Sequence, residues 1–588
     1  MVLVFGGTTE GRKAVEVLEE AGNTFYYSTK TGEQDITLHH GQRIDGALDE
    51  EAMQAFCQGH GIRLMVDAAH PFASQLHQTV ANVSESLAIP VVRYERIYPP
   101  KTDEITWIDD YSQVPRDIHS LLATTGVQSI SKLKPLEAEG IKVYYRILNR
   151  ESSIHLAHQQ GATDDQLCFY PQMVEAEAVL MKESGESGGF SEKIAKAKEK
   201  GMRIIALKRP ELSFRHCVNG PYGLRRAVEK LLPAFYPLHS GLTTGTCATA
   251  AAVAATLRLI KGETPDEVPV VLPNGETIMV AVGYGKGYAY CIKEAGDDPD
   301  VTNGIEIRAS ISLIGGDLKS PTHEMRISNS HQPHIEIIGG EGVGRFTLPG
   351  FDYPPGEAAI NKAPREMIRQ NLEQFDTPLK VIISVPQGAE IAKRTFNPRL
   401  GIEGGISIIG VSGIVKPFSE EAFIDSIRKC MTVAKASGSE RVVINSGGKS
   451  ERFVKALYPD LPQQAFVEYG NYIGETLKIA NELGFKYVTL GVMLGKAVKL
   501  AAGHLDTHSR KTTMDKTFIQ QMLDEANIAI DISEMTMARE LWDKIPQELT
   551  EHFCRMVLQH CLMHCQPLVP QTRLTLLLIG DDGTIHSQ

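Results

Sequence analysis

A loop rich in glycine and threonine follows the first apolar run of the chain. The run "MVLVF" is typical of a buried strand, and "GGTTEGRKAVEVLEEAG" reads as a loop that opens a helix. Glycines let a backbone approach a ligand closely, and a helix N-terminus favours a phosphate group. A tight turn without a ligand has the same pattern, so the loop alone does not decide. The residues predicted to contact a nucleotide cofactor are Gly6, Gly7, Thr8, Thr9 and Gly11.

The end of the second predicted strand, "TFYYSTKTG", carries hydroxyl groups and a cation. An NAD site usually has an acidic residue here for the ribose 2′-hydroxyl. Ser28, Thr29 and Lys30 suit a 2′-phosphate instead, so we expect NADPH rather than NADH. A solvated loop lysine explains Lys30 equally well.

Two titratable residues follow the strand in "GIRLMVDAAHPF". Asp67 and His70 stand where that strand ends and the next helix begins, which is the ligand edge of an open α/β sheet. Asp67 is a candidate general acid or substrate contact, and His70 a candidate substrate contact. An Asp before a helix more often caps it, and a lone histidine before Pro71 is more often structural.

A second α/β run places further polar residues at predicted strand ends and in a Gly/Ser loop. Its cations could converge on an acidic substrate, although each alone is more often a solvated surface charge. The residues predicted to contact substrate are Arg146, Lys182, Ser184, Gly185 and Arg209.

Composition narrows the class of protein. The 588 residues are 42% hydrophobic and 22% charged, as in globular proteins, and the length suggests about three to four structural domains. A net charge of −12 argues against a general nucleic-acid binder. Nine scattered cysteines suit a reducing cytoplasm. The chain shows no signal-peptide pattern and no apolar run that could span a bilayer, so we expect a cytoplasmic protein without membrane partners. The oligomeric state is left open.

Residues 1–236 resemble the precorrin-6A reductases of corrin biosynthesis through "GGTTEGR", "VDAAHPFASQLH", "KESG" and "KRP". The resemblance implies two Rossmann-like α/β lobes, about 1–125 and 126–236, with NADPH and the macrocycle in the cleft. It also implies hydride transfer to a conjugated ring carbon and protonation of the neighbouring carbon. Asp67, Tyr145 and water remain alternative proton donors.

The rest of the chain, 238–588, opens a new unit with "SGLTTGTCATAAAVAA". The motifs "TTGTCA", "AGDDPDVTNG", "GGEGVGR", "FNPRLGIEGGISIIG" and "GKAVKLAAGHLDTHS" look like the cobalt-precorrin-5B C1-methyltransferase family over about 238–510. This resemblance implies S-adenosylmethionine as methyl donor and carbon 1 of a corrinoid as acceptor, with cobalt arriving only as part of the substrate. We expect a mixed α/β unit that is unlike the common tetrapyrrole methyltransferases.

Several residues of this second unit are candidates for its site. The loop of Asp297, Asp298 and Asp300 could bind a cation or ligand groups, and it also resembles an ordinary turn. The expected substrate contacts are Asp297, Asp298, Asn397 and Arg399. The expected cofactor contacts are Thr244, Gly245 and Thr246. Proton handling is assigned to His504 and His508, with Glu468 as a further candidate.

No resident metal is expected. The tail "HFCRMVLQHCLMHC" is interpreted as structural, because nothing downstream completes a four-ligand set. The chain is thus predicted to be a bifunctional corrin-ring enzyme that methylates first and reduces second. The alternatives are a methyltransferase fused to an NADPH-binding regulatory module, or to a reductase of another substrate.

Overall fold

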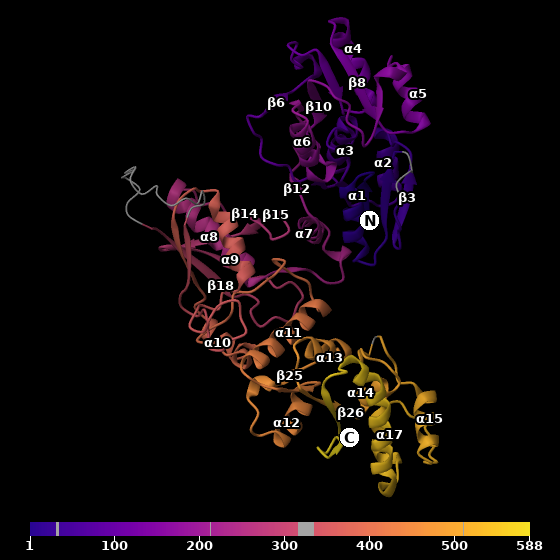
Figure 1. Ribbon diagram of the computed structural model, residues 1–588, viewed down its shortest axis with the longest axis vertical. Coiled ribbons are helices and arrows are strands. Elements are labelled where there is room, and N and C mark those ends of the chain that lie inside the picture. The colour runs from indigo at the N-terminus through magenta and orange to yellow at the C-terminus, as the bar shows by residue number, and fades with distance from the viewer. Residues whose placement is uncertain (31–34, 212, 315–333, 510) are drawn as a thin grey trace. The chain divides into compact units, whose positions relative to one another are not determined.

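The computed structural model describes residues 1–30, 35–211, 213–314, 334–509 and 511–588. It divides into two compact units (Figure 1). Unit 1 comprises Met1–Ser240 and Pro269–Met279, and unit 2 comprises Gly241–Val268 and Val280–Gln588. No helix of the described residues is long and apolar enough to cross a membrane.

The first sheet of unit 1 is entirely parallel, and alternate residues of its central strand face different helices. Val2 and Val4 pack with α1 (Thr9–Glu19) and α7 (Pro221–Leu231). Leu3 and Phe5 pack with α2 (Glu50–Gly59) and α3 (Ser74–Leu87) on the other face. Both faces are therefore covered, which explains the unbroken apolar strands. Across the sheet, the strands are β12 (His216–Val218), β5 (Val91–Tyr94), β4 (Leu64–Asp67), β1 (Val2–Phe5), β2 (Phe25–Thr29) and β3 (Gly41–Asp45).

The second sheet of unit 1 repeats this plan. Leu121 packs with α4 (Ile130–Ala138) and α5 (Glu151–Gln159), and Leu122 faces α6 (Phe190–Glu199) on the other side. Both sheets have the Rossmann arrangement, in which the chain reverses direction across the sheet beside its first strand. Its parallel strands are, in order, β6 (Ile105–Ile108), β11 (Arg203–Leu207), β10 (Ala178–Lys182), β7 (Ser120–Ala123), β8 (Lys142–Ile147) and β9 (Leu167–Phe169).

The two lobes exchange their outermost connections, which differs from the lobe limits expected near residue 125. β6 and β7 lie before that limit and belong to the second sheet, whereas β12 lies after the second lobe and pairs with β5 of the first. His216 lies beside Val92 in this pairing. Pairing across such a sequence separation leaves no local signal, so the strand pattern alone could not reveal it.

Unit 2 begins with a buried helix, α8 (Thr244–Lys261), that packs on β17, β18 and α9 (Lys362–Glu373). The residues from Cys247 to Ala254 are at most 1% exposed. Small side chains allow this close approach of helix and sheet. The mixed sheet is formed by β16 (Gly283–Gly285), β17 (Tyr288–Ile292), β18 (Glu306–Leu313), β21 (Leu379–Ser384) and β19 (Ile335–Gly339).

The C-terminal part of unit 2 holds another α/β sheet. Its order is β25-β24-β26-β27-β28, with β28 antiparallel to its neighbour. α12 (Gly448–Leu457) covers one face, and α11 (Glu420–Ala436), α13 (Ile473–Glu482), α14 (Leu494–Ala501) and α17 (Gln547–Cys565) contribute to the core on the other. The strands are β25 (Phe466–Glu468), β24 (Arg441–Asn445), β26 (Tyr487–Met493), β27 (Arg573–Ile579) and β28 (Ile585–Ser587). The predicted fold class, two Rossmann-like lobes followed by a mixed α/β unit, is confirmed.

Candidate functional site

The turn between β1 and α1 has the glycine roles of a dinucleotide loop. A Cβ on Gly6 would lie 2.2 Å from the Tyr27 hydroxyl, and one on Gly11 would lie 2.8 Å from the Gly6 Cα, so both serve close packing. Gly7 has φ +84° and open space above it, so its backbone is free to approach a ligand. Thr8 caps α1 by accepting a hydrogen bond from the Gly11 N–H at 2.9 Å, and Thr9 is the first helical residue. The residues present fit a phosphate group at this turn.

The end of β2 carries hydroxyl groups, as predicted for a 2′-phosphate, and an acid lies beside it. Ser28 and Thr29 are buried, and Lys30 is exposed. The Thr29 hydroxyl lies 3.1 Å from Oδ1 of Asp45 at the end of β3. Asp45 is in turn paired with Arg43 at 3.0 Å. Its charge is thus partly neutralised, which leaves a 2′-phosphate acceptable next to Lys30.

Asp67 is locked in a buried ionic cluster at the end of β4. Its Oδ2 lies 2.6 Å from Nδ1 of His77, and its Oδ1 accepts from Arg93 at 3.0 Å and from the Ala69 N–H at 3.1 Å. The three side chains are at most 1% exposed. Asp67 does not cap α3, whose N-cap is Ala73 without a side-chain hydrogen bond. This geometry favours a positioning role for Asp67 over contact with substrate.

His70 is surrounded by charged groups from both lobes. Burial, followed by the positive charges of Arg96 and Lys182, lowers the pKa of His70 to about 4, with Glu10 and Lys193 also acting on it. Its Nδ1 accepts from the Phe72 N–H at 3.2 Å. The imidazole is therefore neutral at pH 7 and lies where the strand ends of the two sheets approach each other. Tyr145, the other proton-donor candidate, is buried and donates a hydrogen bond to Glu137.

Ser184 and Gly185 pack against a side chain that the motifs did not indicate. Arg96 donates to the Ser184 carbonyl at 2.7 Å and pairs with Glu10 at 2.9 Å. A Cβ on Gly185 would lie 2.8 Å from the Arg96 Cβ. These two predicted substrate contacts are thus occupied by Arg96, which ties the first turn of α1 to the loop after β10.

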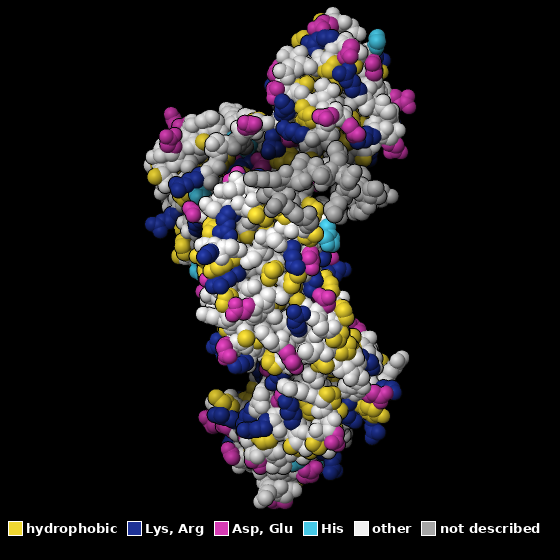
Figure 2. All heavy atoms as spheres, turned by 90° about the vertical axis from the view of Figure 1, so that its left-hand side faces the viewer, with side chains coloured by type: hydrophobic (Ala, Val, Ile, Leu, Met, Phe, Trp, Pro, Cys, Tyr) yellow, Lys and Arg dark blue, Asp and Glu magenta, His cyan; other side chains and the backbone are white. Residues whose placement is uncertain are grey.

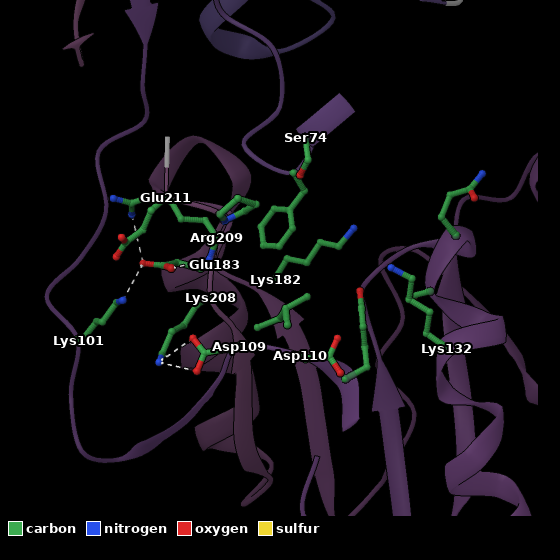
Figure 3. Close-up of a pocket in the computed structure, with 16 residues that line it drawn as sticks. Ser74, Lys101, Asp109, Asp110, Lys132, Lys182, Glu183, Lys208, Arg209 and Glu211 are labelled. Atoms are coloured by element: carbon green, nitrogen blue, oxygen red, sulfur yellow. Dashed lines mark hydrogen bonds and ion pairs between the residues drawn. The ribbon is translucent and has the colours of Figure 1, made fainter. Parts of the chain in front are cut away.

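A cavity of about 610 Å³ opens beside Lys182 at the end of β10 (Figure 3). Arg209 pairs with Glu183 at 3.3 Å and lies 3.7 Å from the Tyr98 ring centroid. Among the described residues, Lys182 and Lys132 have no carboxylate partner within 4 Å, and burial lowers the pKa of Lys182. The cavity therefore presents two uncompensated ammonium groups to an anionic ligand.

A second cavity, of about 540 Å³, contains Arg146 at the end of β8. Arg146 is 9% exposed and lies 5.7 Å from the Tyr170 ring, and the part of the chain described gives it no carboxylate partner within 4 Å. Burial, followed by the charge of Arg146, lowers the pKa of Lys193 to about 8. Two neighbouring cations in a partly buried cavity form a site for an anion. Lys193 lies mid-helix without a motif, so only the fold reveals it.

In unit 2, the loop that opens α8 is anchored by its own chain. The Ile409 N–H donates to the Thr244 hydroxyl at 2.8 Å, and the Gly245 N–H donates to the Ile409 carbonyl at 2.9 Å. Thr246 donates to the Gly413 carbonyl at 2.6 Å. A Cβ on Gly245 would lie 2.9 Å from Pro364. The predicted cofactor contacts therefore already have structural partners in the Gly-rich segment that follows β22 (Ile402–Glu403).

Most other candidates of unit 2 are dispersed. The Phe418 N–H donates to Asp298 at 3.1 Å, whereas Asp297 is exposed. Asn397 is 5% exposed and donates to the Gly405 carbonyl at 3.1 Å. His504 is exposed, and the His508 N–H donates to Asp506 at 3.1 Å. No item of chemistry joins these groups into one site.

Arg399 and Glu468, by contrast, line the same hollow. Arg399 pairs with Glu451 at 2.7 Å. Burial raises the pKa of Glu468. Within the described residues, no group of three or more His, Cys, Asp or Glu side chains could hold a metal ion. On the face shown in Figure 2, basic and acidic side chains are interspersed rather than gathered in a basic surface.

The comparisons with known proteins assign each part of the chain. The sequence model of the precorrin-6x reductase family CbiJ/CobK matches residues 1–229, and that of the CbiD family matches residues 234–417. The cobalt-precorrin-5B C(1)-methyltransferase of Prosthecochloris aestuarii is 39% identical over 59% of this chain and 95% of its own. That of Geobacillus sp. strain WCH70 is 40% identical over 55% of this chain and 89% of its own.

Solved structures similar to the chain come from the same two groups. The crystal structure of the cobalamin biosynthesis protein CbiD from Archaeoglobus fulgidus is 30% identical over 47% of this chain and 83% of its own, with a TM-score of 0.26. A structure described as CobK precorrin-6A reductase is 16% identical over 39% of this chain and 96% of its own, with a TM-score of 0.33.

The chain is a fused, bifunctional enzyme of cobalamin biosynthesis. It belongs to the cobalt-precorrin-5B C(1)-methyltransferase family through its C-terminal part and carries a precorrin-6x reductase part before it. Both predicted family resemblances are confirmed.

Proposed function

We propose that the chain transfers a methyl group from S-adenosylmethionine to carbon 1 of cobalt-precorrin-5B and then reduces the resulting cobalt-precorrin-6A with NADPH to cobalt-precorrin-6B. The observation that carries this proposal is the presence of both families in one chain. The product of the methyltransferase step is the substrate of the reductase step, so the two activities form consecutive reactions.

The turn of Gly6, Gly7 and Gly11 is the proposed pyrophosphate site, with the α1 N-terminus stabilising the negative charge. Ser28, Thr29 and Lys30 are the proposed contacts of the 2′-phosphate. NADPH supplies the hydride when it is bound. The chain's own residues orient the two ligands, and the neutral His70 lies among the groups that face them.

Anionic side chains of the corrin precursor fit the two basic cavities. Arg146 and Lys193 in one cavity, and Lys182 and Lys132 in the other, are cations without carboxylate partners among the described residues. Acetate and propionate groups on the macrocycle complement these charges. Paired contacts at both cavities would also fix the ring in register, which supplies much of the catalysis in a hydride transfer.

Methyl transfer needs little covalent assistance, because the sulfonium group of the donor is already activated. Positioning of donor and acceptor therefore supplies most of the rate, and one proton-handling group completes the chemistry. His504 and His508 keep this role as proposals. Fusion of the two activities raises the local concentration of the intermediate at the second site.

The test supplies cobalt-precorrin-5B, S-adenosylmethionine and NADPH and weighs the products by mass spectrometry. The proposal expects a gain of one methyl group and two hydrogens. Gly7→Asp should stop the reaction at the methylated product, because its carboxylate repels the pyrophosphate. Gly22→Asp is the matched control, since Gly22 also has positive φ (+66°) and open space above it. A product that carries only the methyl group in the unaltered protein supports a regulatory reductase-like part instead. NADPH oxidation without any corrinoid indicates a different reductase substrate.

A further inference from the structure

The C-terminal sheet of unit 2 has the topology of a nucleotide-binding crest. β24 lies between β25 and β26, and the chain reaches these two neighbours by connections that run in opposite directions from β24. In open α/β sheets, ligands bind outside the carboxyl ends of the strands at such a point. Figure 1 shows α12 and β25 next to each other at this part of the unit.

The residues at this crest follow the order of a nucleoside site. β24 ends at Asn445, and the turn Ser446–Gly447–Gly448 leads into α12. A Cβ on Gly448 would meet nothing within 4 Å, so the backbone there is open to close approach. The next strand, β25, ends on Glu468, which stands 20 residues after Gly448. An acid about 20 residues beyond a glycine turn is the usual acceptor for ribose hydroxyls.

The Glu468 carboxylate has no internal partner. Among the described residues it makes no hydrogen bond, and no cation lies within 4 Å of it. The nearby cations are engaged elsewhere: Arg399 pairs with Glu451 at 2.7 Å, and Lys496 donates to the Gly470 carbonyl. A Cβ on Gly447 would lie 3.2 Å from Glu468 Oε1, so the carboxylate lies over the glycine turn. A half-buried acceptor without a donor is costly unless a ligand supplies one.

The hollow beside Glu468 offers apolar surface for a base. Phe396, Phe423 and Phe466 line it together with Glu468, and Phe396 is 47% exposed. An aromatic side chain that is exposed at the rim of a hollow can cover the face of a purine. The hollow thus combines a polar acceptor for a sugar with a ring surface for its base.

The other glycine-rich stretch of unit 2 does not provide such a site. In "GGEGVGR", a Cβ on Gly342 would lie 1.8 Å from the Val385 carbonyl oxygen, and one on Gly344 would lie 2.6 Å from Ile402. The chain itself fills the space above these glycines. They serve packing, so the crest at Gly447 is the better candidate for a ligand.

We propose that this crest binds the adenosyl group of the methyl donor, with the Glu468 carboxylate accepting hydrogen bonds from the ribose hydroxyls. The inference rests on the proposed methyltransferase function and adds the location of its cofactor. It assigns Glu468 a binding role rather than the proton-handling role considered from the sequence.

The test measures binding of S-adenosylhomocysteine, and of its 2′-deoxy analogue, to the full chain by titration calorimetry. Glu468→Gln should weaken S-adenosylhomocysteine binding by about ten- to hundredfold, the range for a hydrogen bond to a charged group. The variant should also lose discrimination against the 2′-deoxy analogue, because the acceptor of that hydroxyl is gone. Glu475→Gln is the control, since Glu475 is an exposed residue of α13 that pairs with Lys478. It should bind like the unaltered protein.

A second variant, Gly447→Ala, should weaken binding as well, because the added methyl group displaces the carboxylate. The thermal midpoint of Glu468→Gln should match that of the unaltered protein, since the side chain has no internal hydrogen bond to lose. Equal affinity of Glu468→Gln and the unaltered protein overturns the inference and leaves the methyltransferase proposal standing. Absence of S-adenosylhomocysteine binding in the unaltered protein, together with absence of methyl transfer, overturns both.

Discussion

Nδ1 of His77 lies 2.6 Å from Oδ2 of Asp67, and both side chains are at most 1% exposed. Arg93 completes the cluster by donating to Oδ1 of Asp67 at 3.0 Å. β4, α3 and β5 each contribute one member, so the cluster holds the ligand edge of the first sheet together. His70, three residues beyond Asp67, is positioned by this arrangement, because its carbonyl lies 3.0 Å from Nε2 of His77.

Asp67→Asn should destabilise unit 1 by about 3–5 kcal/mol, because it removes the carboxylate that compensates a buried guanidinium. Urea unfolding followed by loss of NADPH-oxidising activity measures the change. Asp49→Asn is the control, because Asp49 is an exposed helix cap and Asn caps as well as Asp. Unchanged stability combined with a large fall in kcat would instead support the catalytic role considered for Asp67.

His70 should make unit 1 less stable in mild acid. Its pKa is lowered from 6.5 to about 4, chiefly by burial, so the unfolded state binds the proton more tightly. Stability from this group is therefore full above pH 6.5 and is lost as the pH falls toward 4. Urea unfolding at pH 7 and pH 5 should show a smaller loss in His70→Gln than in the unaltered protein. An equal loss in both proteins contradicts the burial of a neutral imidazole.

Lys193 should give the reductase step an alkaline limit. Its pKa is lowered to about 8 by burial and by the charge of Arg146, so the free enzyme loses this cation as the pH rises through 8. If Lys193 binds a substrate carboxylate, kcat/KM should fall about tenfold between pH 8 and pH 9.5, and kcat should change less. Lys193→Arg should flatten the profile. Lys196→Arg is the control, because exposed Lys196 pairs with Glu192.

Local patterns were sufficient for the strand and helix alternation and for the glycine turn after β1. The roles of Gly6, Gly7 and Gly11 differ in space as the pattern indicates, with two packed and one open. The strand exchange could not be predicted in this way, because β12 and β5 pair across more than a hundred intervening residues. Sequence patterning specifies which face of a strand is buried, but not which distant edge it joins.

Candidate site residues were predicted less well than the elements that carry them. Asp67 was noticed at a strand end, but its partners, His77 and Arg93, carry no motif that links them to it. Lys193 is half-buried on a helix whose neighbours are exposed lysines, so only its place in the cavity distinguishes it. Thr244 and Thr246 resemble ligand-binding hydroxyls in sequence, yet backbone groups some 165 residues away satisfy them.

A final prediction concerns the division between the two units. Glu276 is 1% exposed and accepts hydrogen bonds from the Gly223 N–H at 2.9 Å and the Tyr222 N–H at 3.4 Å. These are amides in the first turn of α7, whose N-cap, Gly220, has no side chain to offer. Glu276 lies in the Pro269–Met279 segment of unit 1, after the start of the methyltransferase sequence.

Glu276→Ala should therefore raise local opening of α7, at a cost of about 1–3 kcal/mol for the amides left without an acceptor. Hydrogen exchange of the α7 peptide in the full chain measures this directly. Glu263→Ala, at an exposed position, is the control and should leave the exchange unchanged. A chain that ends at Ser240 lacks Glu276, so its α7 should exchange as fast as in Glu276→Ala. Slow exchange in that shortened chain would show that the segment is dispensable and that the sequence boundary near residue 238 is also the structural one.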